Sequence, residues 1–104
     1  MESKMVVIIT GAARGIGRAV AIKYAAAGYQ LTLVDQDKEG LDETDLIIKK
    51  TYTIATLICV GDIADANFQQ YIIQQTEIIF QRIDVLINNA AWRSIETMRT
   101  IDRA

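Results

Sequence analysis

Three glycines stand close together in the segment TGAARGIG, residues 10–17. They follow the apolar run Met5–Ile9 and precede a stretch with the residue pattern of a helix. The first turn of a helix presents unpaired N–H groups and a partial positive charge, which attract a phosphate. We expect Gly11 to supply a tight turn, Gly15 to keep side-chain bulk away from a pyrophosphate, and Gly17 to let the helix pack on a sheet. The spacing predicts a loop that binds the phosphates of a nucleotide, with a purely structural turn as the alternative.

An acidic residue stands where such a site would hold a ribose. Asp35 ends the run LTLVD, eighteen residues after Gly17, and a carboxylate there can accept a hydrogen bond from a ribose 2′-OH and repel a 2′-phosphate. Arg14 instead favours NADP, because a cation beside the loop could bind a 2′-phosphate. However, Gln36 occupies the position where a phosphate-binding arginine would help. We therefore predict NAD, with NADP less favoured. The alternative for Asp35 is a solvated acid that starts a helix together with Asp37.

Several other kinds of site are disfavoured by what the sequence lacks. Arg18 and Ala19 follow Gly17, where a P-loop requires lysine and serine or threonine, and a methyltransferase-type loop is kept only as a minor alternative. The chain has no histidine and one cysteine, Cys59, which we expect to be a buried structural thiol, so we predict no metal site. A formal net charge of -2 with 23% charged residues suggests neither a nucleic-acid partner nor a basic membrane patch.

The elements that must position these residues alternate along the chain. Apolar, β-branched runs predict strands at residues 5–10, 30–35, 53–60 and 84–88, and helical spacing predicts helices at 14–27, 37–50 and 65–82. The runs are mostly continuously apolar, as in strands covered on both faces of a parallel sheet. The apolar stripe of the third helix is expected to comprise Phe68, Ile72, Thr76, Ile79 and Ile83. The order predicts an α/β fold, a Rossmann-like doubly wound parallel sheet truncated after about four strands.

Four segments together closely resemble the short-chain dehydrogenase/reductase family: TGAARGIG at 10–17, Asp35, GDIAD at 61–65 and NNA at 88–90. The likeness runs over essentially the whole chain but covers only the N-terminal part of such an enzyme. It implies that Asp62 meets the adenine edge beside the backbone of Ile63. It also implies that Asn88, Asn89 and Ala90 line the adenosine ribose and brace the central strands. With these, the candidate cofactor-binding residues are Thr10, Gly11, Arg14, Gly15, Ile16, Gly17, Asp35, Asp62, Ile63, Asn88, Asn89 and Ala90.

The resemblance also implies an activity whose catalytic residues this chain does not contain. The family exchanges hydride between a nicotinamide and a small alcohol or carbonyl substrate, using a tyrosine four residues before a lysine. No tyrosine here has a lysine at that spacing, Ser94 is not assigned as the catalytic serine, and Ala91 replaces the glycine usual after NNA. We expect residues 1–104 to be the dinucleotide-binding part of one domain in a truncated dehydrogenase, inactive alone. The alternatives are a non-catalytic NAD-binding module and a self-assembling half-domain.

The sequence also gives expectations about the cellular location and the oligomeric state of the protein. The apolar run near the N-terminus is too short for a signal peptide, and no window approaches the roughly 18 to 20 apolar residues that span a bilayer. With a single cysteine, these features predict a cytoplasmic protein with no membrane partner. The bare edge expected at the fourth strand favours a homo-oligomer, although the helices that usually pair subunits in the family are absent from this chain.

Overall fold

Strands and helices alternate along the whole described part of the chain, residues 4–90 of a computed structural model. The elements are β1 (Val6–Thr10), α1 (Gly15–Ala26), β2 (Gln30–Asp35), α2 (Lys38–Thr51), β3 (Thr56–Val60), α3 (Ala66–Phe80) and β4 (Val85–Asn88). Every predicted element is present, in the predicted order. None of the described helices is long and apolar enough to cross a membrane.

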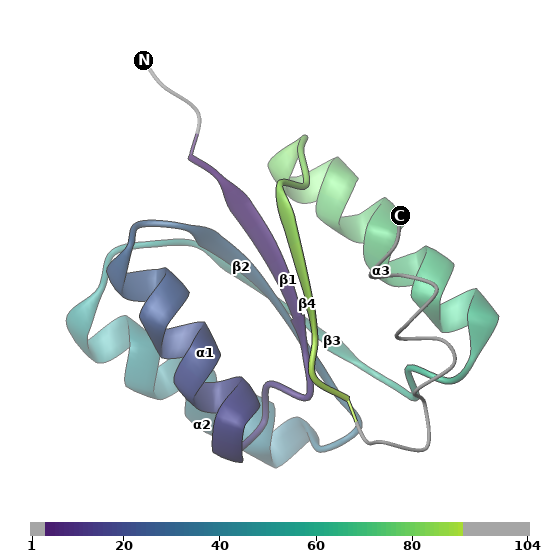
Figure 1. Cartoon of the computed structure of the whole chain (residues 1–104), viewed down its shortest axis with the longest axis horizontal. Helices are drawn as coiled ribbons and strands as arrows, with labels where there is room; N and C mark the ends of the chain where they lie inside the picture. The colour runs from purple at the N-terminus through teal and green to yellow at the C-terminus, as the bar shows by residue number, and fades with distance from the viewer. Residues whose placement is uncertain (1–3, 91–104) are drawn as a thin grey trace.

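The four strands form one parallel sheet in the order β3-β2-β1-β4. The chain moves outward from β1 to β3, then returns through α3 to place β4 on the other side of β1. Because crossovers between parallel strands are right-handed, this reversal moves the connecting helix to the opposite face. Figure 1 shows α1 and α2 together on one side of the sheet and α3 on the other. The structure confirms the α/β, Rossmann-like fold, and the strand order reverses between β1 and β4.

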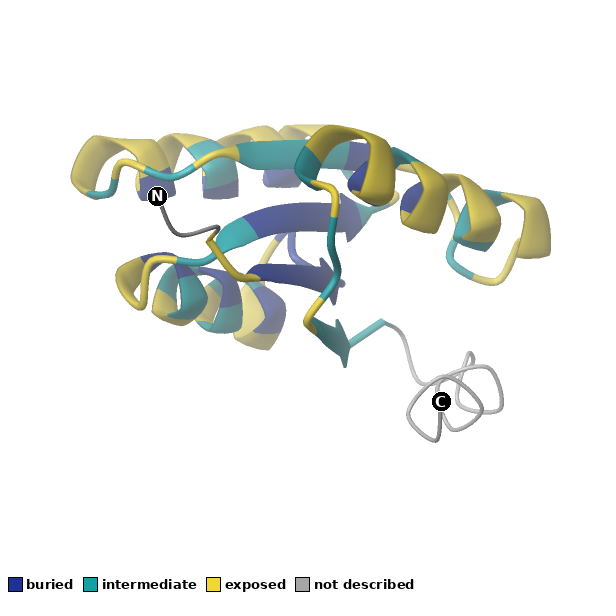
Figure 2. Cartoon of the chain, turned by 90° about the horizontal axis from the view of Figure 1, so that it is seen from above, coloured by how far each residue is buried: buried dark blue, intermediate teal, exposed yellow. Residues whose placement is uncertain are grey.

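The core has two layers because successive strand side chains point to opposite faces. Val7 and Ile9 of β1 pack in the larger cluster under α1 and α2, whereas Ile8 packs in the smaller cluster with Ile72 of α3. Figure 2 shows the buried residues on the strands and on the inward faces of the helices. Cys59 is 2% exposed in the smaller cluster, and burial raises the pKa of its thiol to about 11. The prediction of a buried structural thiol is confirmed.

Two details differ from the sequence-based expectation. The third strand begins at Thr56 rather than at residue 53. Thr56 pairs with Leu31, the second residue of β2, so residues 53 and 54 have no β2 residue opposite them. Ile79 was expected on the buried stripe of α3 but is 54% exposed. The inward residues of α3 follow a four-residue step from Ile72 to Thr76 to the half-buried Phe80, which leaves Ile79 on the solvent side.

A pair of buried hydroxyls joins β2 to α3 and gives a first prediction. The Oγ1 atoms of Thr32 and Thr76 lie 2.8 Å apart, and Thr76 donates to the carbonyl of Ile72 at 2.8 Å, so Thr32 must be the donor to Thr76. Thr76→Val should cost about 2 kcal/mol of unfolding free energy, because it leaves the Thr32 hydroxyl buried without an acceptor. Thr32→Val should cost only about 1 kcal/mol, because Thr76 keeps its carbonyl acceptor. The midpoints of urea unfolding measure both free-energy changes, provided that the dependence of the free energy on urea concentration is the same in the variants. Equal costs for the two variants would contradict the donor assignment.

Candidate functional site

The glycine loop lies at the carboxyl end of the sheet, where β1 passes into α1. Gly11 has φ +69° and Gly15 φ +58°, a left-handed backbone that favours glycine. A Cβ on Gly11 would overlap the carbonyl oxygen of Asn89, and a Cβ on Gly17 would overlap the carbonyl oxygen of Gly11. The turn and the close packing expected of Gly11 and Gly17 are both present. The loop, the start of α1 and the segment after β4 therefore meet at backbone contact distance.

The start of α1 differs from the starts of the other two helices. Asp37 caps α2 by accepting from the Gly40 N–H, and Asp65 caps α3 by accepting from the Asn67 N–H. At α1 the N-cap residue is Arg14, whose side chain makes no capping hydrogen bond, and the first turn contains no acidic residue. The leading N–H groups of a helix have no intrahelical partner and carry the positive end of its dipole. This helix end is therefore available to an anion.

Thr10 and Asn88 join the two strands that flank the reversal of strand order. They are partners in the β1–β4 register, and the Thr10 hydroxyl donates to Asn88 Oδ1 at 2.7 Å. The Nδ2 atom of Asn88 is buried, and no acceptor among the described residues reaches it. Buried amide donors almost always have a partner. In an open α/β sheet the crevice beside this reversal is where ligands bind.

Asp35 ends β2 and holds the glycine loop by its carboxylate. Oδ2 accepts from the N–H of Ala13 at 3.1 Å, and Oδ1 accepts from the N–H of Asp37 at 3.1 Å. The side chain is thus fixed by backbone donors rather than freely solvated. Each carboxylate oxygen can accept more than one hydrogen bond, so Asp35 retains acceptor capacity at the mouth of the site.

The cation beside the loop is already paired. Arg14 Nη2 contacts Asp37 Oδ2, with the Arg14 side chain 77% exposed and that of Asp37 30% exposed. The hydrogen bond from the Gly40 N–H and the Arg14 guanidinium hold the pKa of Asp37 below its usual value. The same contact raises the pKa of Arg14. Both groups are therefore charged at neutral pH, and Asp37 competes with any anion for Arg14.

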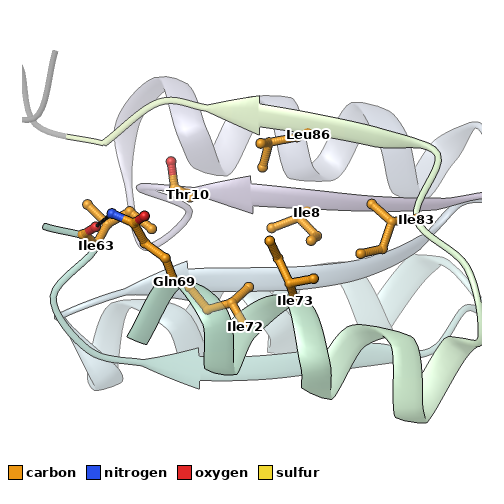
Figure 3. A pocket seen from close by; sticks show the side chains of 8 residues that line it. All are labelled: Ile8, Thr10, Ile63, Gln69, Ile72, Ile73, Ile83 and Leu86. Carbon is orange, nitrogen blue, oxygen red and sulfur yellow. Dashed lines mark hydrogen bonds between the residues drawn. The ribbon is translucent and has the colours of Figure 1, made fainter. Parts of the chain in front are cut away.

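The other predicted residues lie at this end of the sheet with different surroundings. Asp62 follows β3 and accepts from the N–H of Ala64 at 2.9 Å, which makes it a turn acid. Ile63 and Thr10 line an apolar hollow of about 140 Å³ between α3 and strands β1 and β4 (Figure 3). Ile16 is 72% exposed on the first turn of α1. Within residues 4–90, no side-chain hydrogen bond or ion pair joins Asp62 or Ile16 to the other predicted residues. Ala91 and Ser94 lie outside the described residues.

Two residues at this site carried no assignment from the sequence. Arg18 on α1 and Thr44 on α2 contact the carbonyl oxygens of Ala12 and Ala13 on the side of the loop that faces α2. A signal existed in the sequence, since Arg18 lies one helical turn after Arg14, the N-cap of α1, and its N–H donates to the Arg14 carbonyl oxygen next to the loop. Its partner on α2 could not be read from spacing.

The chain is similar to several known proteins. The family model for short chain dehydrogenase matches residues 5–104. Levodione reductase from Leifsonia aquatica is 42% identical over 87 residues, covering 82% of this chain and 32% of that protein. The structure of L-sorbose reductase from Gluconobacter frateurii, complexed with NADPH and L-sorbose, matches with a TM-score of 0.81 at 29% identity, covering 86% of this chain and 34% of that chain. Glucose dehydrogenase of Caenorhabditis elegans in the apo-form matches with a TM-score of 0.81 at 33% identity, covering 94% and 42%. The chain spans about a third of the length of the curated relatives it matches.

Proposed function

This chain belongs to the short-chain dehydrogenase family, and on that premise we propose that it holds the adenosine and pyrophosphate half of an NAD site. The family and the fold imply a nicotinamide cofactor, which when bound supplies the hydride acceptor or donor of an oxidoreductase. The protein's reaction is proposed to be hydride exchange with a small alcohol or carbonyl substrate. The residues described below act by binding and orienting the cofactor.

The uncapped start of α1 is the observation that carries the proposal. Its leading N–H groups and helix dipole favour a pyrophosphate at the turn formed by Gly11 to Gly15, with Thr10, Ile16 and Gly17 adjoining. A Cβ at Gly15 would meet nothing within 4 Å, so the loop borders open space where a ligand fits. The residues present therefore suit a dinucleotide phosphate group.

Asp35 is proposed to select NAD over NADP. Its carboxylate, fixed by the Ala13 and Asp37 N–H groups, can accept hydrogen bonds from the ribose hydroxyls and repels a 2′-phosphate. Arg14, the neighbouring cation, is engaged by Asp37. An exposed ion pair of this kind is weak and by itself does little to keep Arg14 from a 2′-phosphate, so the proposed selectivity depends on the charge of the Asp35 carboxylate. The NADPH in the sorbose reductase structure belongs to that protein and is the competing possibility for this one.

The proposed contacts with the adenosine involve residues at the carboxyl ends of β3 and β4. Asp62 and the backbone of Ile63, after β3, are proposed to meet the adenine. Asn88, which ends β4, and Asn89 and Ala90, which follow it, are proposed to line the adenosine ribose. Among the described residues no acceptor reaches the buried Nδ2 of Asn88, which supports a polar ligand at this edge. Because no tyrosine precedes a lysine by four residues, we expect the 104-residue chain to bind the cofactor without turnover.

Calorimetric titration of the chain with NAD, NADP and ADP-ribose tests the proposal. We expect NAD and ADP-ribose to bind alike, at about millimolar Kd or on the order of 4 kcal/mol, because both present the same adenosine and pyrophosphate. NADP should bind more weakly. Tighter binding of NADP would contradict the role of Asp35, and failure of all three ligands to bind would overturn the half-site itself.

A further inference from the structure

Arg18 reaches from α1 across the back of the glycine loop to α2. Its Nη2 donates to the carbonyl oxygen of Ala13 at 2.6 Å and to that of Gly40 at 3.3 Å, and its Nε donates to Thr44 Oγ1 at 2.9 Å. The Arg18 side chain is only 22% exposed, although it carries a charge. One guanidinium thus connects α1, the loop and α2.

Thr44 holds the loop residue before Ala13 in the same way. Its buried hydroxyl accepts from Arg18 and donates to the carbonyl oxygen of Ala12 at 2.8 Å. The carbonyls of Ala12 and Ala13, which are consecutive in the loop, are therefore both held toward α2. We call Arg18 and Thr44 together the loop clamp.

Holding the carbonyls also fixes the N–H groups. In a trans peptide the C=O and N–H point in opposite directions, so the N–H of Arg14 faces away from the Ala13 carbonyl and from α2. The next peptide back is fixed at both ends, since the Ala12 carbonyl meets Thr44 and the Ala13 N–H meets Asp35. The loop clamp therefore determines which way the donors just before α1 point.

A glycine within α2 allows the helix to come this close. A Cβ on Gly40 would lie 2.7 Å from the Cβ of Ala13 and 2.6 Å from Oδ2 of Asp37. Glycine is less favourable than alanine inside a helix, so the presence of Gly40 in the first turns of α2 is explained by the close contact with the loop.

We propose that Arg18 is a positioning residue of the dinucleotide site, which orients the glycine loop toward the pyrophosphate without touching the cofactor. The inference rests on the proposed function above. The charge of Arg18 is matched by Glu43, whose Oε1 lies 2.7 Å from its Nη2, so Arg18 acts by its hydrogen-bond geometry rather than by attracting phosphate from a distance. Arginine suits this because its planar fork serves several acceptors at once, which a lysine ammonium on a flexible stem does not reproduce.

The test compares a ligand with phosphates to one without them. For Arg18→Gln, the Kd for ADP-ribose should rise about tenfold, as expected for losing hydrogen bonds to a charged group. The Kd for adenosine, followed by ligand-observed NMR, should change less than twofold. Arg18→Lys should behave like Arg18→Gln, because it keeps the charge but not the fork. Thr44→Val should weaken ADP-ribose binding in the same selective way.

Arg82→Gln is the matched control, because Arg82 also makes a two-atom ion pair, with Asp84, but at the opposite end of the sheet. It should leave both affinities unchanged. An equal loss for adenosine and ADP-ribose in Arg18→Gln would show a merely structural role, and retained affinity in Arg18→Gln or in Arg18→Lys would also overturn the proposal. If the unaltered chain binds no ADP-ribose, the proposed function fails and this inference fails with it; if it binds and only the Arg18 result is negative, the proposed function stands.

Discussion

Gly17→Ala should destabilise the chain by about 3 kcal/mol and abolish nucleotide binding, because the added Cβ has no room. It would overlap the carbonyl oxygen of Gly11 and lie 2.9 Å from Nδ2 of Asn89. The Gly11 carbonyl is a backbone group, which cannot change rotamer to relieve the overlap as a flexible side chain can. Relief requires α1 to move off the sheet, and that movement displaces the loop from the end of β4. The midpoint of urea unfolding and a calorimetric titration with NAD measure the two effects.

Gly15→Ala is the matched control in the same loop. A Cβ at Gly15 meets nothing within 4 Å, and only the positive φ of +58° opposes the substitution. Left-handed backbone costs a non-glycine residue about 1 kcal/mol, so this variant should remain folded. If Gly17→Ala proves no more damaging to stability than Gly15→Ala, the close approach of α1 to the loop is not what the site requires.

Asp35→Ala should raise the affinity for NADP relative to NAD by about tenfold, because the carboxylate that repels a 2′-phosphate is removed. The same substitution leaves the N–H groups of Ala13 and Asp37 without their acceptor. Absolute affinities for both nucleotides should therefore fall. The ratio of the two Kd values isolates selectivity from loop damage, because damage to the loop affects both ligands alike.

Asp35→Asn separates the two roles further. The amide oxygen can still accept from one backbone N–H, while the negative charge is lost. We expect the same change in the ratio of Kd values as for Asp35→Ala, with a smaller loss of stability in urea. An unchanged preference for NAD in both variants would refute the selection by Asp35. The Arg14–Asp37 pair would then be the next residues to test as the source of the preference.

The sequence by itself was sufficient for the order of elements and for the place of the polar residues along them. Continuous apolar runs and helical spacing depend on local periodicity, and parallel strands bring their carboxyl ends to one edge. Thr10, Asp35 and Asn88 could therefore be assigned to strand ends, and the structure puts each of them there. The roles of Gly11 and Gly17 as turn and packing glycines followed from the same local pattern.

Tertiary structure alone decided which side chains meet. The pairing of Arg14 with Asp37, the loop clamp and the contact of Gly11 with Asn89 all join segments more than twenty residues apart. They depend on how closely α2 and β4 approach the loop. Ile79 turned outward for a related reason, since only the packing of α3 on the sheet selects among apolar residues one position apart. Periodicity says that a face is apolar, whereas the distance and rotation of the neighbouring element determine what that face touches.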